Sequence, residues 1–264
     1  MIPGRSETTS TDSDGPEGAA GPAPAEDSPY PKRRARMVER QLRQRGIEDE
    51  CVLRAMGTVP RELFVPEELR RDAYRDGALR IGEGQTISQP WIVACMAALL
   101  ELRGDERVLE VGTGSGYAAA VLSLCCRELI TIERHPALAD RARRQLAELG
   151  YRNVEVRTGD GTRGAPDRAP FGGISVTATA DEEPPPALLA QLAPGAALVC
   201  PVRRGGRERL IRFRDSGEET VVPVRFVPLV ESPTEESEEE AGESRPGGEG
   251  RAAQDDGPQG EEQA

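Results

Sequence analysis

Between residues 106 and 230, short apolar runs alternate with stretches that have the length and period of amphipathic helices. The apolar runs predict strands at 107–111, 128–133, 154–157, 174–177 and 197–202. The stretches between them predict helices at 116–126, 136–149 and 185–192. The clearest is 136–149, where Leu138, Ala142, Leu146 and Leu149 share one face and Gly150 follows the last turn. Single helices between successive strands imply right-handed crossovers, hence a parallel sheet with helices on both faces.

Two further apolar runs follow, at 209–213 and 221–228, with a turn signal between them at Ser216-Gly217. Strands joined by a short turn pair in the antiparallel sense. The expected fold class is therefore α/β, with a doubly wound, mostly parallel sheet and an antiparallel edge.

The segment before the sheet reads as helical. Residues 33–45 predict a helix that Gly46 ends, and Asp49 can cap a short second helix. A loop-rich stretch is expected from 60 to 87. Pro90 has the place of a first-turn proline, and 91–102 predicts a mostly buried helix.

The two ends of the chain lack the side chains that a core needs. Residues 1–29 hold one large aliphatic side chain beyond Met1, and residues 231–264 hold none. All nine aromatic residues fall within 30–230. We therefore expect disordered tails at 1–29 and 231–264 and one folded domain at 30–230, made of a helical segment (30–105) and a sheet segment (106–230). The acidic second tail is expected to be solubilising, with contact to a basic partner as the alternative.

The charge belongs mainly to these ends. The 264 residues carry a net charge of −12, of which 1–29 hold −5 and 231–264 hold −10, so the middle is at +3. Neither a nucleic-acid partner nor a membrane partner is expected, since no strongly basic surface and no apolar stretch of about 20 residues is present. With one His and five scattered Cys, neither a histidine metal site nor a disulfide framework is expected. No secretory signal opens the chain, and we expect a cytoplasmic protein with reduced thiols.

The strongest local signal is the run Leu109 to Tyr117, in which a strand enters three alternate glycines and then a helix. Gly112, Gly114 and Gly116, with Thr113 between the first two, form a GxGxG turn at the carboxyl end of the strand. Glycine permits positive φ and lets a ligand approach the backbone. Because Tyr117 breaks the GxGxxG pattern, a pyrophosphate cradle is disfavoured.

Acidic residues follow at matching positions on the next two strands. Glu133 ends the second strand, where an acid can accept hydrogen bonds from both ribose hydroxyls. Asp160, between Gly159 and Gly161, could receive an adenine amino group. Together with Glu110, these acids suit an adenosine cofactor whose sulfonium is positive, namely S-adenosyl-L-methionine.

Each of these features also has a plainer reading. A lone GxGxG turn often only connects a strand to a helix, and a strand-terminal Glu is often solvated. The three features in order, on successive turns after strands, favour a methyltransferase-like fold.

Several blocks make the assignment more specific. They are VPRELFVP at 59–66, IGEGQTISQPWIVACMAALLEL at 81–102, VLEVGTGSGYAAAVL at 108–122, LGYRNVEVRTGDG at 149–161, QLAPGAALVCPV at 191–202 and VRFVPLV at 224–230. On these blocks, the chain resembles the protein-L-isoaspartate O-methyltransferase family over 33–230. The resemblance implies a class I S-adenosylmethionine-dependent methyltransferase fold, which is Rossmann-like. We expect a monomer.

The resemblance also implies an activity. The family transfers a methyl group to the α-carboxylate of L-isoaspartyl residues in damaged proteins or peptides, which starts their repair through a succinimide. It implies Ser88 as the catalytic residue, with Thr86, Ile87 and Ser88 positioning the substrate carboxylate. The plainer reading of Ser88 is that it caps the helix that begins near Pro90.

This chain departs from the family in two places, which we expect to adjoin the cofactor pocket. Gly172 stands where the family usually has Asp, and residues 179–186 hold three acids and three prolines. Two alternative functions stay open: a related methyltransferase dedicated to an Asp of one peptide, and a non-catalytic binder of isoaspartyl sites or cofactor.

Overall fold

The computed structural model describes residues 29–231, and its amino-terminal part is helical as predicted. Helix α1 (Tyr30–Met37) continues through a π-helical turn, η1 (Val38–Leu42), and a 3-10 turn, η2 (Arg43–Arg45). Gly46 ends this run at φ +87°, which glycine adopts without strain. Asp49 caps α2 (Glu50–Thr58) by accepting a 2.9 Å hydrogen bond from the Val52 N–H.

The stretch predicted as loop contains regular structure. Two 3-10 helices, η3 (Arg61–Phe64) and η4 (Glu67–Asp72), precede a small antiparallel hairpin of β1 (Leu79–Gly82) and β2 (Gln85–Ile87). Helix α3 (Pro90–Leu99) begins at Pro90 as predicted but ends before 102. The helix cannot continue through Glu101, which takes φ +53°, and the carboxylate of this residue pairs with Arg212 and Arg214.

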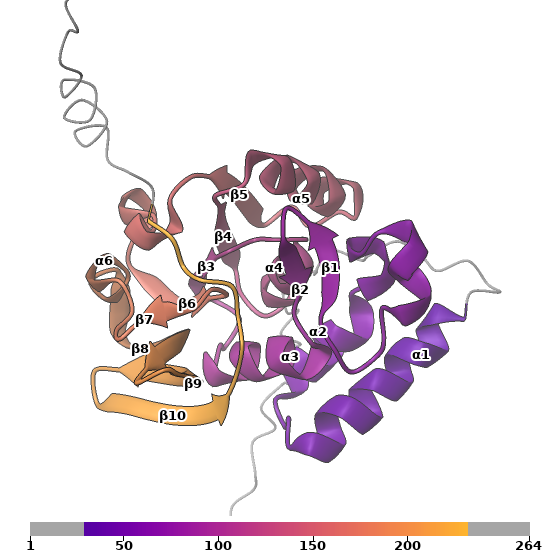
Figure 1. Cartoon of the computed structure of the whole chain (residues 1–264), viewed down its shortest axis with the longest axis horizontal. Helices are drawn as coiled ribbons and strands as arrows, with labels where there is room; N and C mark the ends of the chain where they lie inside the picture. The colour runs from indigo at the N-terminus through magenta and orange to yellow at the C-terminus, as the bar shows by residue number, and fades with distance from the viewer. Residues whose placement is uncertain (1–28, 232–264) are drawn as a thin grey trace, which may run out of the picture. The chain divides into compact units, whose positions relative to one another are not determined.

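The main sheet has the predicted doubly wound topology. Its strand order is β10-β9-β8-β6-β3-β4-β5, with β7 paired to β8 (Figure 1). The strands are β3 (Arg107–Val111), β4 (Glu128–Glu133), β5 (Val154–Thr158), β6 (Phe171–Val176), β7 (Ala180–Asp181), β8 (Leu192–Arg204), β9 (Arg207–Arg214) and β10 (Gly217–Pro223). Strands β3 to β8 pair in parallel, and β8, β9 and β10 pair antiparallel at the edge. The predicted fold class is thereby confirmed.

Side chains alternate along the central strands between two buried clusters. Val108 and Leu129 pack into a cluster with helices α2, α3, α4 (Tyr117–Ser123) and α5 (Pro136–Glu148). Leu109 and Ile130, one residue further on, pack on the other face with Leu188 of α6 (Pro186–Leu189). The sheet is therefore buried on both faces, as its near-continuous apolar strands require.

Several strand boundaries differ from the prediction, among them those of β6 and β10. Strand β6 starts at Phe171 although Gly172 and Gly173 lie within it. A Cβ at Gly172 would lie 2.6 Å from Cγ of Glu106, whose carboxylate accepts hydrogen bonds from the N–H groups of Arg103 and Gly104. The strand predicted over 221–228 is correct only for 221–223, since β10 runs over Gly217–Pro223 and residues 224–228 lie outside it.

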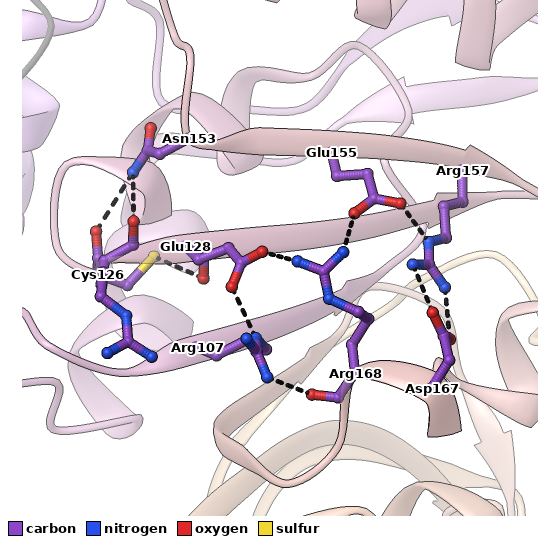
Figure 2. A network of polar contacts seen from close by, with 9 residues as sticks. Arg107, Cys126, Glu128, Asn153, Glu155, Arg157, Asp167 and Arg168 are labelled. Carbon is purple, nitrogen blue, oxygen red and sulfur yellow. Dashed lines mark hydrogen bonds and ion pairs between the residues drawn. The ribbon is translucent and has the colours of Figure 1, made fainter.

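An ion-pair network connects the parallel strands β3, β4 and β5 (Figure 2). Arg107 Nε lies 2.7 Å from a Glu128 carboxylate oxygen, and Arg168 bridges Glu128 and Glu155. Arg157 adds a bidentate pair with Asp167 at 2.7 and 2.8 Å. The network therefore ties β3, β4 and β5 to η6 (Pro166–Arg168), from Arg107 and Glu128 at the amino ends of β3 and β4 to Arg157 near the carboxyl end of β5.

Between residues 29 and 231, no helix is long and apolar enough to cross a membrane. The tails expected at 1–29 and 231–264 lie, apart from Pro29 and Glu231, outside the described residues. The domain limits stay a prediction.

Candidate functional site

A cavity of about 880 Å³ opens at the carboxyl ends of the parallel strands. Its walls come from five parts of the chain, namely residues 84–89 with 92–93, 111–118 without 116, 132–135, 177–178 and 223–230, together with Ala78 and Gly161. This is the edge of a doubly wound sheet at which ligands bind. The predicted glycine loop and the predicted substrate block thus share one space.

The glycine loop forms the floor of this cavity. Gly112 has φ +95°, and a Cβ there would lie 2.2 Å from the Thr177 hydroxyl, which donates to the Gly112 carbonyl at 2.7 Å. Gly116, at φ +87°, begins α4 and packs on α5, where a Cβ would lie 3.3 Å from that of Ala142. Gly112, Thr113 and Gly114 line the cavity, and Gly116 shapes the helix start instead.

Glu133 lies in the cavity wall with a side chain only 4% exposed. One carboxylate oxygen accepts the Gly114 N–H at 2.8 Å, and the other accepts the His135 N–H at 3.0 Å. Each oxygen has a second lone pair, so both can still accept a hydroxyl from a ligand. Glu133 therefore fixes the loop and presents two acceptors side by side, as a ribose diol requires.

Glu110 does not line the cavity, contrary to the prediction. It is fully buried behind the loop, where Thr131 donates to one carboxyl oxygen at 2.6 Å and lies 2.7 Å from the Thr113 hydroxyl. The other oxygen has no partner within residues 29–231. Burial raises the pKa of Glu110 to about 8, with Glu133 adding to the rise, so the group is mostly neutral at pH 7. Glu110 therefore supports the glycine loop through Thr131 and contributes no negative charge to the cavity wall.

The Gly159-Asp160-Gly161 turn contributes one cavity residue. Gly161 lines the cavity, whereas Gly159 and Asp160 do not. Asp160 caps η5 (Gly161–Arg163) by accepting from the N–H and the hydroxyl of Thr162 at 2.9 and 2.7 Å. Contact between Asp160 and an adenine stays a prediction.

Thr86 and Ile87, within β2, and Ser88, between β2 and α3, lie in the opposite wall. The reading of Ser88 as a helix cap is not supported, because the N-cap of α3 is Gln89. Among the hydrogen bonds of residues 29–231, none involves the Ser88 hydroxyl, while its carbonyl accepts from Arg61 at 2.7 Å. The hydroxyl is therefore available to a ligand in the cavity.

Arg61 is a residue that the sequence reading missed. Its guanidinium is fully buried, donates to the carbonyls of Ala73 and Ser88 at 2.7 Å each, and lies 4.7 Å from the centre of the Tyr117 ring. Burial lowers its pKa. One side chain thereby joins the substrate block to the first residue of α4. Arg61 belongs to the VPRELFVP block at 59–66, and this membership is the signal by which the sequence could have indicated its importance.

Residues 223–230 were also missed as part of the site. They cross the cavity as an irregular segment held at Thr179, whose N–H donates to the Val227 carbonyl and whose carbonyl accepts from Leu229, both at 2.8 Å. Phe226 N–H donates to Glu208 at 3.2 Å. An apolar run of this length is found both in buried strands and in cavity walls. The apolar residues of this segment therefore predicted a strand.

The family of the chain follows from its similarity to known proteins. The profile of the protein-L-isoaspartate(D-aspartate) O-methyltransferases matches residues 32–234. The chain belongs to this family. A relative from Methanoculleus marisnigri named protein-L-isoaspartate O-methyltransferase is 49% identical over 209 residues, which are 78% of this chain and 94% of the relative. Another, from Anaeromyxobacter, is 52% identical over 210 residues, 78% of this chain and 86% of the relative.

Solved structures agree on the fold. One named protein-L-isoaspartate O-methyltransferase has a TM-score of 0.66 at 28% identity, covering 74% of this chain and 65% of that one. A second, from Plasmodium falciparum, was solved in complex with S-adenosyl-L-homocysteine as a putative member of the family. It has a TM-score of 0.65 at 22% identity, over 75% of this chain and 99% of its own.

Of the two departures from the family pattern, Gly172 lies away from the cavity, contrary to the prediction, whereas residues 179–186 begin beside the cavity wall. Gly172 stands near the amino end of β6, against Glu106 before β3, and is no part of the cavity wall. Residues 179–186 hold β7 and the start of α6, and none of them lines the cavity, but Thr179 bonds through its backbone to Val227 and Leu229 of the cavity wall. Parallel strands place all their amino ends at one edge of the sheet, so Gly172 faces away from the glycine loop.

Proposed function

We propose that this chain, as a member of its family, is a protein-L-isoaspartate O-methyltransferase. It transfers a methyl group from S-adenosyl-L-methionine to the α-carboxylate of L-isoaspartyl residues in proteins or peptides. One observation carries the proposal: Thr86, Ile87 and Ser88 face the glycine loop and Glu133 across a single cavity. A methyl transfer needs donor and acceptor in one water-poor space.

The residues of the loop side fit the cofactor. The close approach at Gly112 keeps the floor free of side chains, and Glu133 offers two acceptor oxygens to a ribose. Gly161, where a Cβ would lie 2.4 Å from the Val111 side chain, leaves space at the adenine end. When bound, S-adenosylmethionine supplies a methyl group activated by a positively charged sulfur. Gly159 and Asp160 are proposed to support this end of the pocket.

The residues of the opposite side fit a carboxylate. Ser88 precedes α3, so its hydroxyl and the first N–H groups of a ten-residue helix can hold an anion. A carboxylate with a pKa near 4 is ionised at pH 7, so it attacks without a general base. We propose that Ser88, supported by Thr86 and Ile87, aligns one carboxylate oxygen with the methyl group, and that residues 223–230 exclude water.

The remaining expectations rest on composition and resemblance. A monomeric state, a cytoplasmic location and the absence of nucleic-acid or membrane partners stay predictions. So does the expectation that no metal takes part.

The test uses methyl-labelled S-adenosylmethionine and two peptides that differ only in L-isoaspartate or L-aspartate at one site. Labelled methanol released by mild base reports the methyl ester. We expect label from the isoaspartyl peptide alone, reduced at least tenfold in Ser88→Ala. Ser216→Ala, in the exposed β9–β10 turn, is the matched control and keeps full activity.

Other results would redirect the assignment. Cofactor binding without label on either peptide would refute the general repair activity and favour a dedicated peptide or a non-catalytic binder. Label on both peptides would refute the specificity. Full activity in Ser88→Ala would remove Ser88 from the proposed role but leave the activity standing.

A further inference from the structure

Two of the five cysteines, far apart in the sequence, meet on the side of the molecule that joins the helical segment to the sheet. Cys51 lies in the first turn of α2, and Cys125 follows the end of α4. Their sulfur atoms are 2.9 Å apart, and both thiols are free. Neither residue lines the cavity, so methyl transfer does not account for the pair.

We propose that Cys51 and Cys125 form a thiol–disulfide exchange site that reacts with small disulfides, such as oxidised glutathione, and closes to an intramolecular disulfide. This modification is independent of the proposed methyl transfer. The sulfurs need to approach by about 0.9 Å to reach the ~2.05 Å of an S–S bond. The side chains are therefore close to bonding distance before any reaction.

The two thiols have different roles because their surroundings differ. Cys51 is half-buried, whereas Cys125 is buried. A hydrogen bond with Cys125 and the nearby Arg54 lower the pKa of Cys51 to about 7, although burial and Asp49 oppose the change. The thiolate of Cys51 and burial raise the pKa of Cys125. Cys51 is thus the attacking group and Cys125 the resolving group.

The chemistry balances in two exchanges. The Cys51 thiolate attacks one sulfur of the small disulfide, forms a mixed disulfide and releases one small thiolate, which takes a proton from water. The Cys125 thiol then loses its proton to solvent, and its sulfur attacks Sγ of Cys51 and releases the second small thiol. Two electrons pass from the protein thiols to the small disulfide. Since the mixed disulfide removes both the hydrogen bond between the two cysteines and the Cys51 charge, it removes two causes of the raised pKa of Cys125, while burial remains.

The other three cysteines are buried and lack such a neighbour in residues 29–231. Burial raises the pKa values of Cys95, Cys126 and Cys200 to about 11, 12 and 12. Cys126 is the informative comparison, because it adjoins Cys125 but its thiol is directed to the Glu128 carbonyl, 3.5 Å away. From the sequence alone, Cys126 and Cys125 would be equal candidates to pair with Cys51.

The disulfide would close a ring that contains both walls of the cavity. The two cysteines are 74 positions apart, and the residues between them include Thr86–Ser88 and the glycine loop. A link of this length restricts the unfolded chain strongly. We expect the melting temperature of the oxidised protein to exceed that of the reduced protein by roughly 5–15 °C.

The experiment incubates the full chain, under native conditions, with oxidised glutathione, followed by blocking of free thiols and mass spectrometry. We expect the wild-type protein to lose two hydrogen atoms and to yield a peptide that links Cys51 to Cys125. Cys125→Ala is expected to stop with one glutathionyl group on Cys51, and Cys51→Ala to remain unmodified. Cys126→Ala, the matched control, is expected to close as the wild type does.

Three results would overturn the proposal. They are an unmodified wild-type protein, a wild-type protein that stops at the mixed disulfide, and a link from Cys51 to Cys126. All three results are measured on the wild-type chain, so they remain decisive even if a variant folds poorly.

Discussion

Replacing Glu110 by Gln tests the claim that this buried carboxyl is neutral in the folded protein. The change keeps the shape of the side chain and an oxygen that can accept from Thr131, 2.6 Å away. It removes the ability to ionise, and it replaces one carboxyl oxygen by an amide NH2 group, whose cost of burial does not depend on pH. The wild-type carboxyl has one oxygen without a partner in residues 29–231, which gives an ionised form little compensation for burial.

The magnitude follows from the two pKa values. Folding raises the pKa of Glu110 from an ordinary value of 4.5 to about 8. Below pH 4.5 the carboxyl is neutral in both states, and the Glu form costs the fold nothing. Between pH 4.5 and 8 the unfolded chain loses this proton and the folded chain keeps it, so stability falls as pH rises, by about 1.4 kcal/mol for each pH unit. The total loss is roughly 5 kcal/mol at pH 8 and above.

The assay is urea unfolding of wild type and Glu110→Gln from pH 5.5 to 8.5. The variant is expected to gain stability relative to wild type with rising pH, by roughly 3–4 kcal/mol across this window. Glu148→Gln, at the exposed end of α5, serves as the control for removing one carboxylate. A difference between Glu110→Gln and wild type that stays constant with pH would refute the reasoning, because it would mean that folding leaves this proton's binding unchanged.

Three further substitutions probe the site and the sheet. In Arg61→Lys, the lysine cannot donate to both carbonyls that Arg61 contacts. We expect kcat/KM for an isoaspartyl peptide to fall about tenfold or more, while the cofactor Kd measured by calorimetry stays within about twofold. A change confined to cofactor binding would contradict this prediction. Gly112→Ala places a Cβ 2.2 Å from the Thr177 hydroxyl, on a residue with positive φ. We expect it to weaken cofactor binding by at least about tenfold in the same assay. Unchanged affinity would argue against the glycine loop as part of the cofactor site. Gly172→Ala displaces the Glu106 carboxylate from the N–H groups that it accepts from. We expect the free energy of unfolding to fall by about 1–2 kcal/mol and the melting temperature by a few degrees, with the cofactor Kd unchanged. Weaker cofactor binding would show that this end of β6 is coupled to the cavity.

The sequence determined those parts of the protein whose pattern is local. Apolar runs of strand length, the helical face of α5, the cap at Asp49 and the first-turn Pro90 each depend on neighbours a few residues away, and the structure confirms them. The glycine spacing also placed the cavity, because the carboxyl end of a parallel strand is defined by chain direction alone.

Only the tertiary structure decided what depends on contacts between distant segments. Glu110 and Glu133 look alike in the sequence, but only Glu133 lines the cavity. Glu110 pairs in register with Thr131, two residues before Glu133, so it lies deeper along the same face of the sheet, where side chains from elsewhere in the chain cover it. The contact of Arg61 with Ser88 spans 27 positions, and that of Cys51 with Cys125 spans 74. Such pairs form because packing of the sheet and helices brings them together, and no periodicity along the chain records that packing.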